Sequence, residues 1–174
     1  MMRRVITRQG GVTLIEVLVA MFVMAVGVLG IVGLQVVALQ NSRTALYRSE
    51  ATVLASDIMD RIRANPRGDY APVDIGDTPP NPPNCLASVC SAAQMANFDL
   101  AQWKCSLGAF DEDGACTELG VTGSLPAGDG SIAEANTLFT VRVQWEDPSA
   151  LCDQDEENPD VCFVELQMLF GELP

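Results

Sequence analysis

The first pattern along the chain is a long apolar run near its N-terminus. No charged or strongly polar side chain occurs from Val17 to Leu34, and residues 12–15 can extend the run. These 18 residues reach the lower length limit of a membrane-spanning helix. A secretory signal peptide has a shorter apolar region, followed by a cleavage site of small residues. The pattern therefore predicts a membrane helix that stays with the protein.

The helical pattern continues beyond the apolar run. Residues 35–64 contain neither glycine nor proline, and Asn65-Pro66 should end the helix because a residue before proline disfavours helical geometry. The sequence thus predicts one helix from Thr13 to Ala64, with a membrane half (about 12–38) and an amphipathic half (39–64). Two sets of apolar side chains recur there at helical spacing: Tyr47, Ala51, Leu54, Ile58 and Ile62, and Leu39, Leu46 and Val53.

The sequence pattern of residues 65–174 predicts a separate head domain. "DTPPNPPNC" (77–85) is a proline-rich loop, and apolar residues at helical spacing predict a short helix from Ser91 to Trp103. "LPAGDGSI" (125–132) has the composition of a turn. These elements would follow the long helix and precede the strands.

Two segments near the C-terminus alternate between apolar and polar residues. "LFTVRVQWED" (138–147) places Phe139, Val141, Val143 and Trp145 on one face, and Thr140, Arg142, Gln144 and Glu146 on the other. "CFVELQMLF" (162–170) alternates through Val164, Leu166, Met168 and Phe170. Such alternation predicts half-buried strands. An acidic loop joins them, so we expect an antiparallel hairpin packed against the long helix, and an α+β fold.

Charge is distributed unevenly along the chain. From residue 65 onward there are nineteen acids and three basic residues, whereas basic residues exceed acids before it. An acidic head argues against nucleic acid or anionic lipid as its partner. Its simplest role is to keep an exported domain soluble. Arg3, Arg4 and Arg8 precede the apolar run with no matching cluster after it, which places the N-terminus in the cytoplasm.

All six cysteines lie in the acidic part of the chain: Cys85, Cys90, Cys105, Cys116, Cys152 and Cys162. An even number on one side of a membrane segment indicates disulfides formed in an oxidising compartment. Zinc is the competing interpretation. The sequence has no histidine, and the cysteine spacings do not repeat a C-x2-C knuckle, so zinc is disfavoured.

The sequence alone allows fifteen ways to pair six cysteines. Cys152 and Cys162 flank the loop between the two strands, and pairing of Val143 or Trp145 near Val164 would bring these cysteines together. Sequential pairing would then also join Cys85 to Cys90 and Cys105 to Cys116. The alternative is that Cys85 or Cys90 crosses to Cys105 or Cys116.

Motifs of catalytic or cofactor chemistry are missing from the sequence. Without histidine, histidine-based acid–base catalysis and histidine-ligated metals are excluded. "GDGSIAEA" (128–135) lacks the lysine and the preceding strand of a phosphate-binding loop. "DQDEEN" (153–158) and "DEDGAC" (111–116) match a calcium loop incompletely, so solvated loops are favoured. We expect no enzyme activity, no cofactor and no metal.

One acid, Glu16, lies near the start of the apolar run. A carboxylate within a membrane costs about 2.5–3.5 kcal/mol on insertion scales, so Glu16 either sits at the interface or has a cationic partner. Cleavage after Gly11 would create such a cation, the α-amine of Val12, four residues from Glu16. Gly10 and Gly11 suit a scissile site because glycines resist helix formation and leave room for a protease.

"GVTLIEVLVA" (11–20) resembles the class III signal of type IV prepilins and pseudopilins, a short basic leader followed by an apolar helix. The resemblance implies that residues 1–11 are a leader, which a membrane prepilin peptidase removes after Gly11. It also implies methylation of the new N-terminus at Val12, where the family usually has phenylalanine or methionine. Glu16 would neutralise the terminal amine of a neighbouring subunit during assembly.

Four further segments resemble the PilV family of minor pilins, also called type IV pilus modification proteins: "LASDIMDRIRANPRGDY" (54–70), "FDLAQWKCSL" (98–107), "LPAGDGSI" (125–132) and "FTVRVQWED" (139–147). This resemblance implies a pilin fold, in which a long N-terminal helix packs on a small antiparallel sheet. It implies a minor pilin that takes part in pilus assembly, initiation or modification.

The expected partners are other pilins and minor pilins, prepilin peptidase and inner-membrane lipid, with no nucleic acid. The chain would cross the inner membrane once with its head in the periplasm, and would be assembled into the pilus at the cell surface. Two alternatives stay open: a minor pseudopilin of a type II secretion system, and an adhesin-like binding head at the pilus tip.

Overall fold

A computed structural model describes residues 11–148, 152, 158 and 160–169. The described chain forms two compact units, one up to Gln40 and one from Asn41 onward, and helix α1 (Leu14–Ala64) contributes to both. The helix expected from Thr13 thus begins one residue later, with the Thr13 carbonyl accepting the first hydrogen bonds of the helix, from the amides of Glu16 and Val17. Residues 1–10 of the predicted leader lie outside the described residues.

The first unit contains the apolar half of α1. Its most apolar 18-residue window has a mean hydropathy of 2.8, and none of that window is buried by the rest of the chain. Large side chains such as Phe22 and Leu29 are 70% and 71% exposed. By length and composition this helix can cross a membrane.

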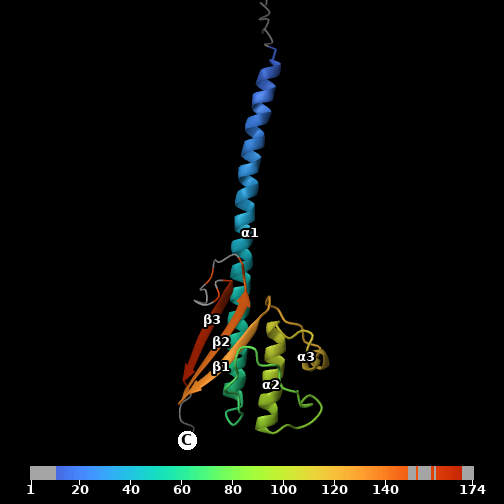
Figure 1. Cartoon of the computed structure of the whole chain (residues 1–174), viewed down its shortest axis with the longest axis vertical. Helices are drawn as coiled ribbons and strands as arrows, with labels where there is room; N and C mark the ends of the chain where they lie inside the picture. Colours follow the sequence, from blue (N-terminus) through green and yellow to red (C-terminus); the bar gives the residue numbers. More distant parts are fainter. Residues whose placement is uncertain (1–10, 149–151, 153–157, 159, 170–174) are drawn as a thin grey trace, which may run out of the picture. The chain divides into compact units, whose positions relative to one another are not determined.

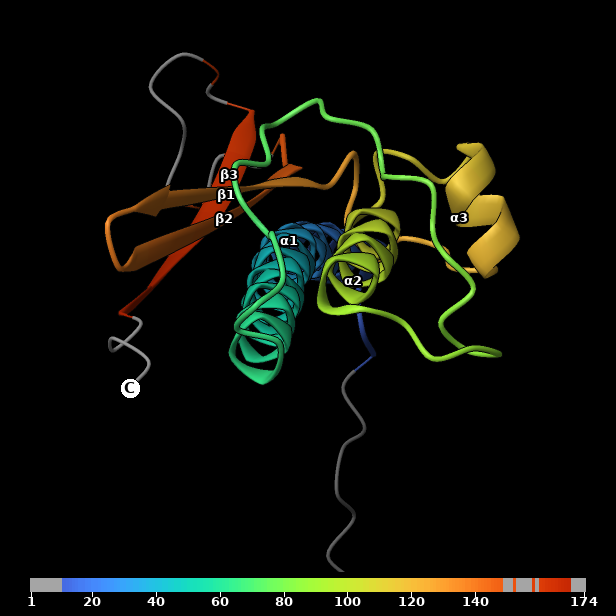
Figure 2. The same cartoon turned by 90° about the horizontal axis from the view of Figure 1, so that it is seen from below.

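The second unit, the head, is built around the other half of α1. Ala51, Ala55, Ile58, Met59 and Ile62 are buried there. In the head the sheet lies against one side of α1, and α2 lies beside α1 (Figure 1). The view along the axis shows the same arrangement, with α3 beyond α2 (Figure 2).

Only one of the two predicted apolar sets of α1 packs in the core. The set from Tyr47 to Ile62 is buried or half-buried, whereas Leu39, Leu46 and Val53 are 65%, 63% and 58% exposed. At 100° per residue, Leu46 and Val53 lie roughly 120–140° around the helix from the centre of the first set. The sheet and α2 cover a single side of α1, so the second set has no cover within the described chain.

Helix α2 (Ala92–Leu107) extends four residues beyond the predicted end at Trp103. Ser91 caps it through a capping box with Gln94, which satisfies two orphan backbone donors. The helix also packs closely on its neighbours: the Trp103 indole donates to the Leu54 carbonyl of α1 at 3.1 Å. A Cβ added at Gly130 would lie 2.6 Å from the Trp103 ring, so glycine permits this contact.

Helix α3 (Gly114–Leu119) was not predicted. It has six residues, too few to show a hydrophobic period, and its first residue is a glycine. Asp113 caps its start by accepting a hydrogen bond from the Ala115 amide at 2.8 Å. The disulfide from Cys116 to α2 holds it in place, so tertiary structure rather than helix propensity explains this element.

The sheet has three antiparallel strands in the order β1-β2-β3, namely Asp129–Ala135, Leu138–Glu146 and Val161–Leu169. The predicted hairpin of β2 and β3 is confirmed, with Val143 paired with Val164 and Trp145 paired with Cys162. The core-facing residues Val141, Val143 and Trp145 are buried as the alternation predicted. Phe170, the last residue of the predicted second strand, lies outside the described residues.

The prediction of a turn through residue 132 was wrong. Residues 125–127 do turn, but β1 begins at Asp129 and pairs with β2, for example Ile132 with Val141. The strand sequence "DGSIAEA" is poor in β-branched and aromatic residues, so its propensity did not indicate a strand. Pairing with the strongly alternating β2 supplies the stability that this local sequence lacks.

Candidate functional site

The first candidate site is the segment around the predicted cleavage position. Gly11, Val12 and Thr13 precede the helix, and Val12 is 71% exposed. Glu16 lies in the first turn of α1, where a negative charge interacts favourably with the helix dipole. The predicted scissile bond therefore lies in exposed, non-helical chain. Such a backbone is open to a protease.

Glu16 is exposed, and no described residue forms an ion pair with it. Its carboxylate is therefore available to a cation from outside the described chain. Val12, whose α-amine the predicted cleavage would free, lies in the non-helical chain ahead of the turn that carries Glu16. This arrangement can support pairing between an amine and a carboxylate of neighbouring chains.

The six cysteines form three disulfides in sequential order. Cys85 bonds to Cys90, Cys105 to Cys116 and Cys152 to Cys162, with Cα–Cα distances of 5.5, 5.2 and 5.7 Å. The crossed pairings left open by the sequence do not occur among them. The second bridge joins α2 to α3, and the third joins the segment after β2 to the start of β3. Disulfides therefore hold three separate parts of the head.

We expect non-reducing peptide mapping of the native protein to recover Cys152 linked to Cys162. Replacing both by serine should destabilise the head by about 2–4 kcal/mol, because the unfolded chain gains freedom when the loop opens. Chemical denaturation of the double variant measures this loss. A peptide that links Cys152 to any of the first four cysteines would contradict the pairing.

A buried ion pair ties α2 to β1 in the core of the head. The Lys104 ammonium contacts Asp129 Oδ1 at 2.5 Å and also donates to the carbonyls of Asp74 (3.1 Å) and Gly130 (2.9 Å). Lys104 is only 1% exposed. Asp129 accepts further hydrogen bonds from the amides of Gly76 and Gly130. Both charges are thus fully satisfied, which makes this a structural pair.

Sequence reasoning did not identify the ion pair. The available signal was that Lys104 is the one lysine of an acidic head, placed on the helix face between Leu100 and Leu107. A charged residue on a buried face requires a partner of opposite charge. Nineteen acids compete for that role, so the sequence could not indicate Asp129.

Lys104→Met should destabilise the head by about 3–5 kcal/mol, because it leaves the Asp129 carboxylate buried without its cation. Methionine keeps most of the side-chain volume, so the effect reports charge and not a cavity. Adding Asp129→Asn should restore part of the stability. Equal stability of Lys104→Met and the wild type in a urea titration would show that the pair is not needed.

A second polar network joins the end of α1 to α2. Arg61 contacts Asp99 Oδ1 at 3.1 Å and donates to Gln102 at 2.6 Å, while Tyr70 donates to Asp99 Oδ2 at 2.6 Å. Burial and the bond to Asp99 raise the pKa of the Tyr70 hydroxyl above its ordinary value. The hydroxyl therefore stays protonated and keeps donating. This network fixes the two helices relative to each other.

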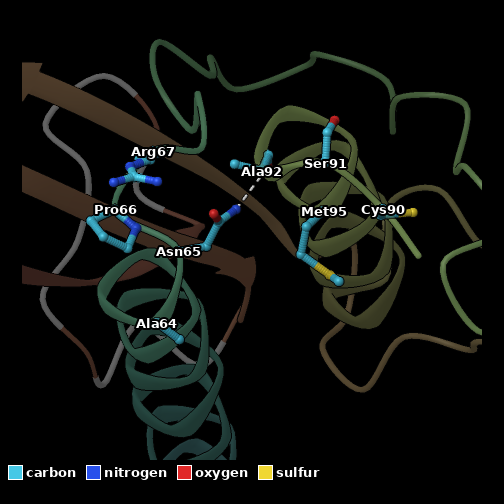
Figure 3. A pocket seen from close by; sticks show the side chains of 8 residues that line it. All are labelled: Ala64, Asn65, Pro66, Arg67, Cys90, Ser91, Ala92 and Met95. Carbon is cyan, nitrogen blue, oxygen red and sulfur yellow. Dashed lines mark hydrogen bonds between the residues drawn. The ribbon is translucent and has the colours of Figure 1, made fainter.

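A cavity of about 630 Å³ lies where α1 ends and α2 begins. Figure 3 shows the side chains that line it: Ala64, Asn65, Pro66, Arg67, Cys90, Ser91, Ala92 and Met95. Asn65 reaches across and donates to the Ala92 carbonyl at 2.8 Å. Arg67 is the one ionisable side chain in the lining, and Cys90 is held in a disulfide. The lining offers contact surface without acid–base or nucleophilic groups.

Two acidic segments resemble calcium loops incompletely. Most of the first, residues 153–158, lies outside the described residues. In the other segment, Asp111 accepts from the Gly123 amide and Asp113 caps α3. Among the described residues, no group of three or more His, Cys, Asp or Glu side chains is placed to hold a metal.

Two family comparisons match this chain. Residues 6–32 match the prokaryotic N-terminal methylation motif, and residues 33–101 match the Tt1218-like family, described as type IV pilin Tt1218. The two matches adjoin, and together they span the predicted signal, α1 and most of α2. Comparisons with curated proteins and with solved structures gave no match.

Proposed function

This chain belongs to the type IV pilins and is a pilus subunit, and on that premise we propose that it is a minor pilin cut by prepilin peptidase after Gly11. The observation that carries the proposal is the N-terminal segment itself. An exposed, non-helical Gly11–Val12 bond precedes an apolar helix whose first turn holds Glu16. These are the features that cleavage, methylation of Val12 and amine–carboxylate pairing between subunits require.

The minor-pilin assignment rests on the resemblance of four segments to PilV, and these segments also supply contacts that hold the head together. Residues 54–70 contain Arg61 and Tyr70, which meet Asp99 in the segment 98–107. Lys104 of that same segment pairs with Asp129 in the segment 125–132. The resemblance therefore concerns residues that determine how this head packs.

The proposed location is the inner membrane, with the N-terminus in the cytoplasm and the head in the periplasm, before assembly into the pilus. The three leader arginines favour this orientation. The disulfides of the head fit an oxidising compartment. The proposed partners are prepilin peptidase, membrane lipid, and other pilins that contact α1.

Quantitative mass spectrometry of sheared, purified pili tests the minor-pilin role. We expect the mature chain in pili at a small fraction of the major pilin, and fewer or altered pili in a deletion strain. The competing role is that of a minor pseudopilin, which shares the N-terminal signal. Normal pili together with lost protein secretion in the deletion strain would favour that role.

A further inference from the structure

An uncharged segment interrupts the acidic head. Residues 78–98 contain no Asp, Glu, Lys or Arg, although residues 65–174 carry nineteen acids and three basic residues. The central parts of protein interfaces are depleted in charged residues, because burying a charge without a partner is costly. Another protein can therefore cover this segment without removing water from a charged side chain within it.

Two large apolar side chains in this segment face solvent. Leu86 is 85% exposed and Val89 is 102% exposed, more than any other large apolar side chain of the described head. Single exposed apolar residues are common on protein surfaces. Here, however, the two lie three residues apart in one short turn. They form a compact apolar projection, which we call the neutral turn (residues 85–90).

A disulfide and local hydrogen bonds constrain the neutral turn. The Cys85–Cys90 disulfide closes it into a ring of six residues. Asn84, the residue before the ring, binds it from outside: its carbonyl accepts from the Ser88 amide (3.2 Å) and hydroxyl (2.7 Å), and its side chain accepts from the Ala87 amide (3.2 Å). A preorganised element loses little conformational entropy on binding, so its two apolar side chains can act as anchors.

Two residues of the neutral turn line hollows of the head. Cys90 lines the cavity of about 630 Å³ together with Pro66 and Met95 (Figure 3). Leu86 lines a second hollow of about 190 Å³, together with Phe98 and other residues. The neutral turn therefore combines an exposed apolar pair with two hollows that its own residues line.

Charges around this surface limit the kind of partner that it fits. Glu118 lines the same hollow as Leu86, and Arg67 lines the other hollow. Residues 65–174 as a whole carry nineteen acids and three basic residues. A partner should thus present basic groups around an apolar recess. An anionic membrane surface would be repelled, and a second copy of this head has too few basic residues to match.

We propose that the neutral turn docks into a second protein, different from this chain, through an apolar pocket bordered by Lys and Arg side chains. Leu86 and Val89 fill the pocket, and Glu118 faces its basic border. The disulfide keeps the turn in its binding shape. This inference does not depend on the chain being a minor pilin.

Site-specific photo-crosslinking of the full-length chain in its native host tests the proposal. A benzoylphenylalanine at Ala87, an exposed position inside the ring, leaves both anchors in place. We expect one protein product, with the crosslinked residues mapped by mass spectrometry to an apolar pocket that Lys and Arg border. Crosslinks confined to lipid or to a second copy of this chain, or no product, would overturn the proposal.

Matched variants separate docking from mere proximity. Leu86→Ser should lower the crosslink yield about tenfold, because one buried leucine accounts for at least that factor in affinity. Leu169→Ser removes a leucine of similar exposure, 75%, from β3 and should have no effect. Glu118→Lys should also lower the yield, unlike Glu134→Lys on the exposed end of β1. Equal yields for Leu86→Ser and Leu169→Ser would contradict the anchoring role.

Discussion

A Gly11→Val variant is expected to remain full length in the membrane and to be missing from pili. Nothing in the described chain lies within 4 Å of a Cβ added at Gly11, so the substitution leaves the rest of the protein undisturbed. Its effect must arise when the peptidase binds the segment. A β-branched side chain stiffens the backbone and crowds the scissile bond. We expect nearly complete loss of processing.

Gly11→Ala is the matched control, because a methyl group neither branches nor fills much of a protease subsite, and most of the processing should persist. Intact-mass measurement and N-terminal sequencing of the membrane-bound and pilus-bound forms give the result. A mature chain of Gly11→Val that begins at Val12 would refute the cleavage position. In wild-type pili, an N-terminus at Met1 or Met2 would refute the processing itself.

The sequence predicted those elements whose local pattern agrees with their tertiary environment. Alternation in β2 is strong because Val141, Val143 and Trp145 face the core, and the register with β3 followed from it. In α1 the absence of glycine and proline from residue 35 to residue 64 indicated a continuous helix. Local propensity and global packing favour the same structure in these segments.

The missed elements depend on contacts that no local pattern reveals. The weak strand β1 is stabilised by pairing with β2, and α3 by its cap and its disulfide. The exposed set containing Leu46 and Val53 also recurs at helical spacing, every seven residues. Periodicity therefore could not distinguish the side of α1 that the head covers from the side that it leaves open.

The sequence predicts the N-terminal candidate site better than it predicts the neutral turn. Gly11, Val12 and Glu16 could be proposed from the sequence because membrane insertion makes an isolated carboxylate costly, which indicates a function for the acid. The neutral turn was not identified, although its lack of charge can be read from residues 78–98. Proposing it as a docking surface required the exposed fractions of Leu86 and Val89 and the pairing of Cys85 with Cys90, which only the structure provides.

Glu16→Val should insert into the membrane at least as well as the wild type and should largely fail to enter pili. Valine removes a polar group from lipid, so insertion becomes easier. During assembly, however, the amine of a neighbouring subunit would lose its counter-ion in an apolar environment. Leaving one charge of a buried pair uncompensated costs about 3–5 kcal/mol, which corresponds to at least a hundredfold loss of incorporation.

Immunoblots of membrane and sheared-pilus fractions measure the two steps separately. Glu50→Val provides the matched control, because it removes an acid from the same helix within the head and leaves the N-terminal turn intact. This control should appear in both fractions at wild-type levels. We expect Gly11→Val to block processing, whereas Glu16→Val leaves the predicted scissile bond intact. A processed but unassembled Glu16→Val chain would therefore isolate the assembly step. Wild-type amounts of Glu16→Val in pili would show that the carboxylate does not pair with a neighbouring amine.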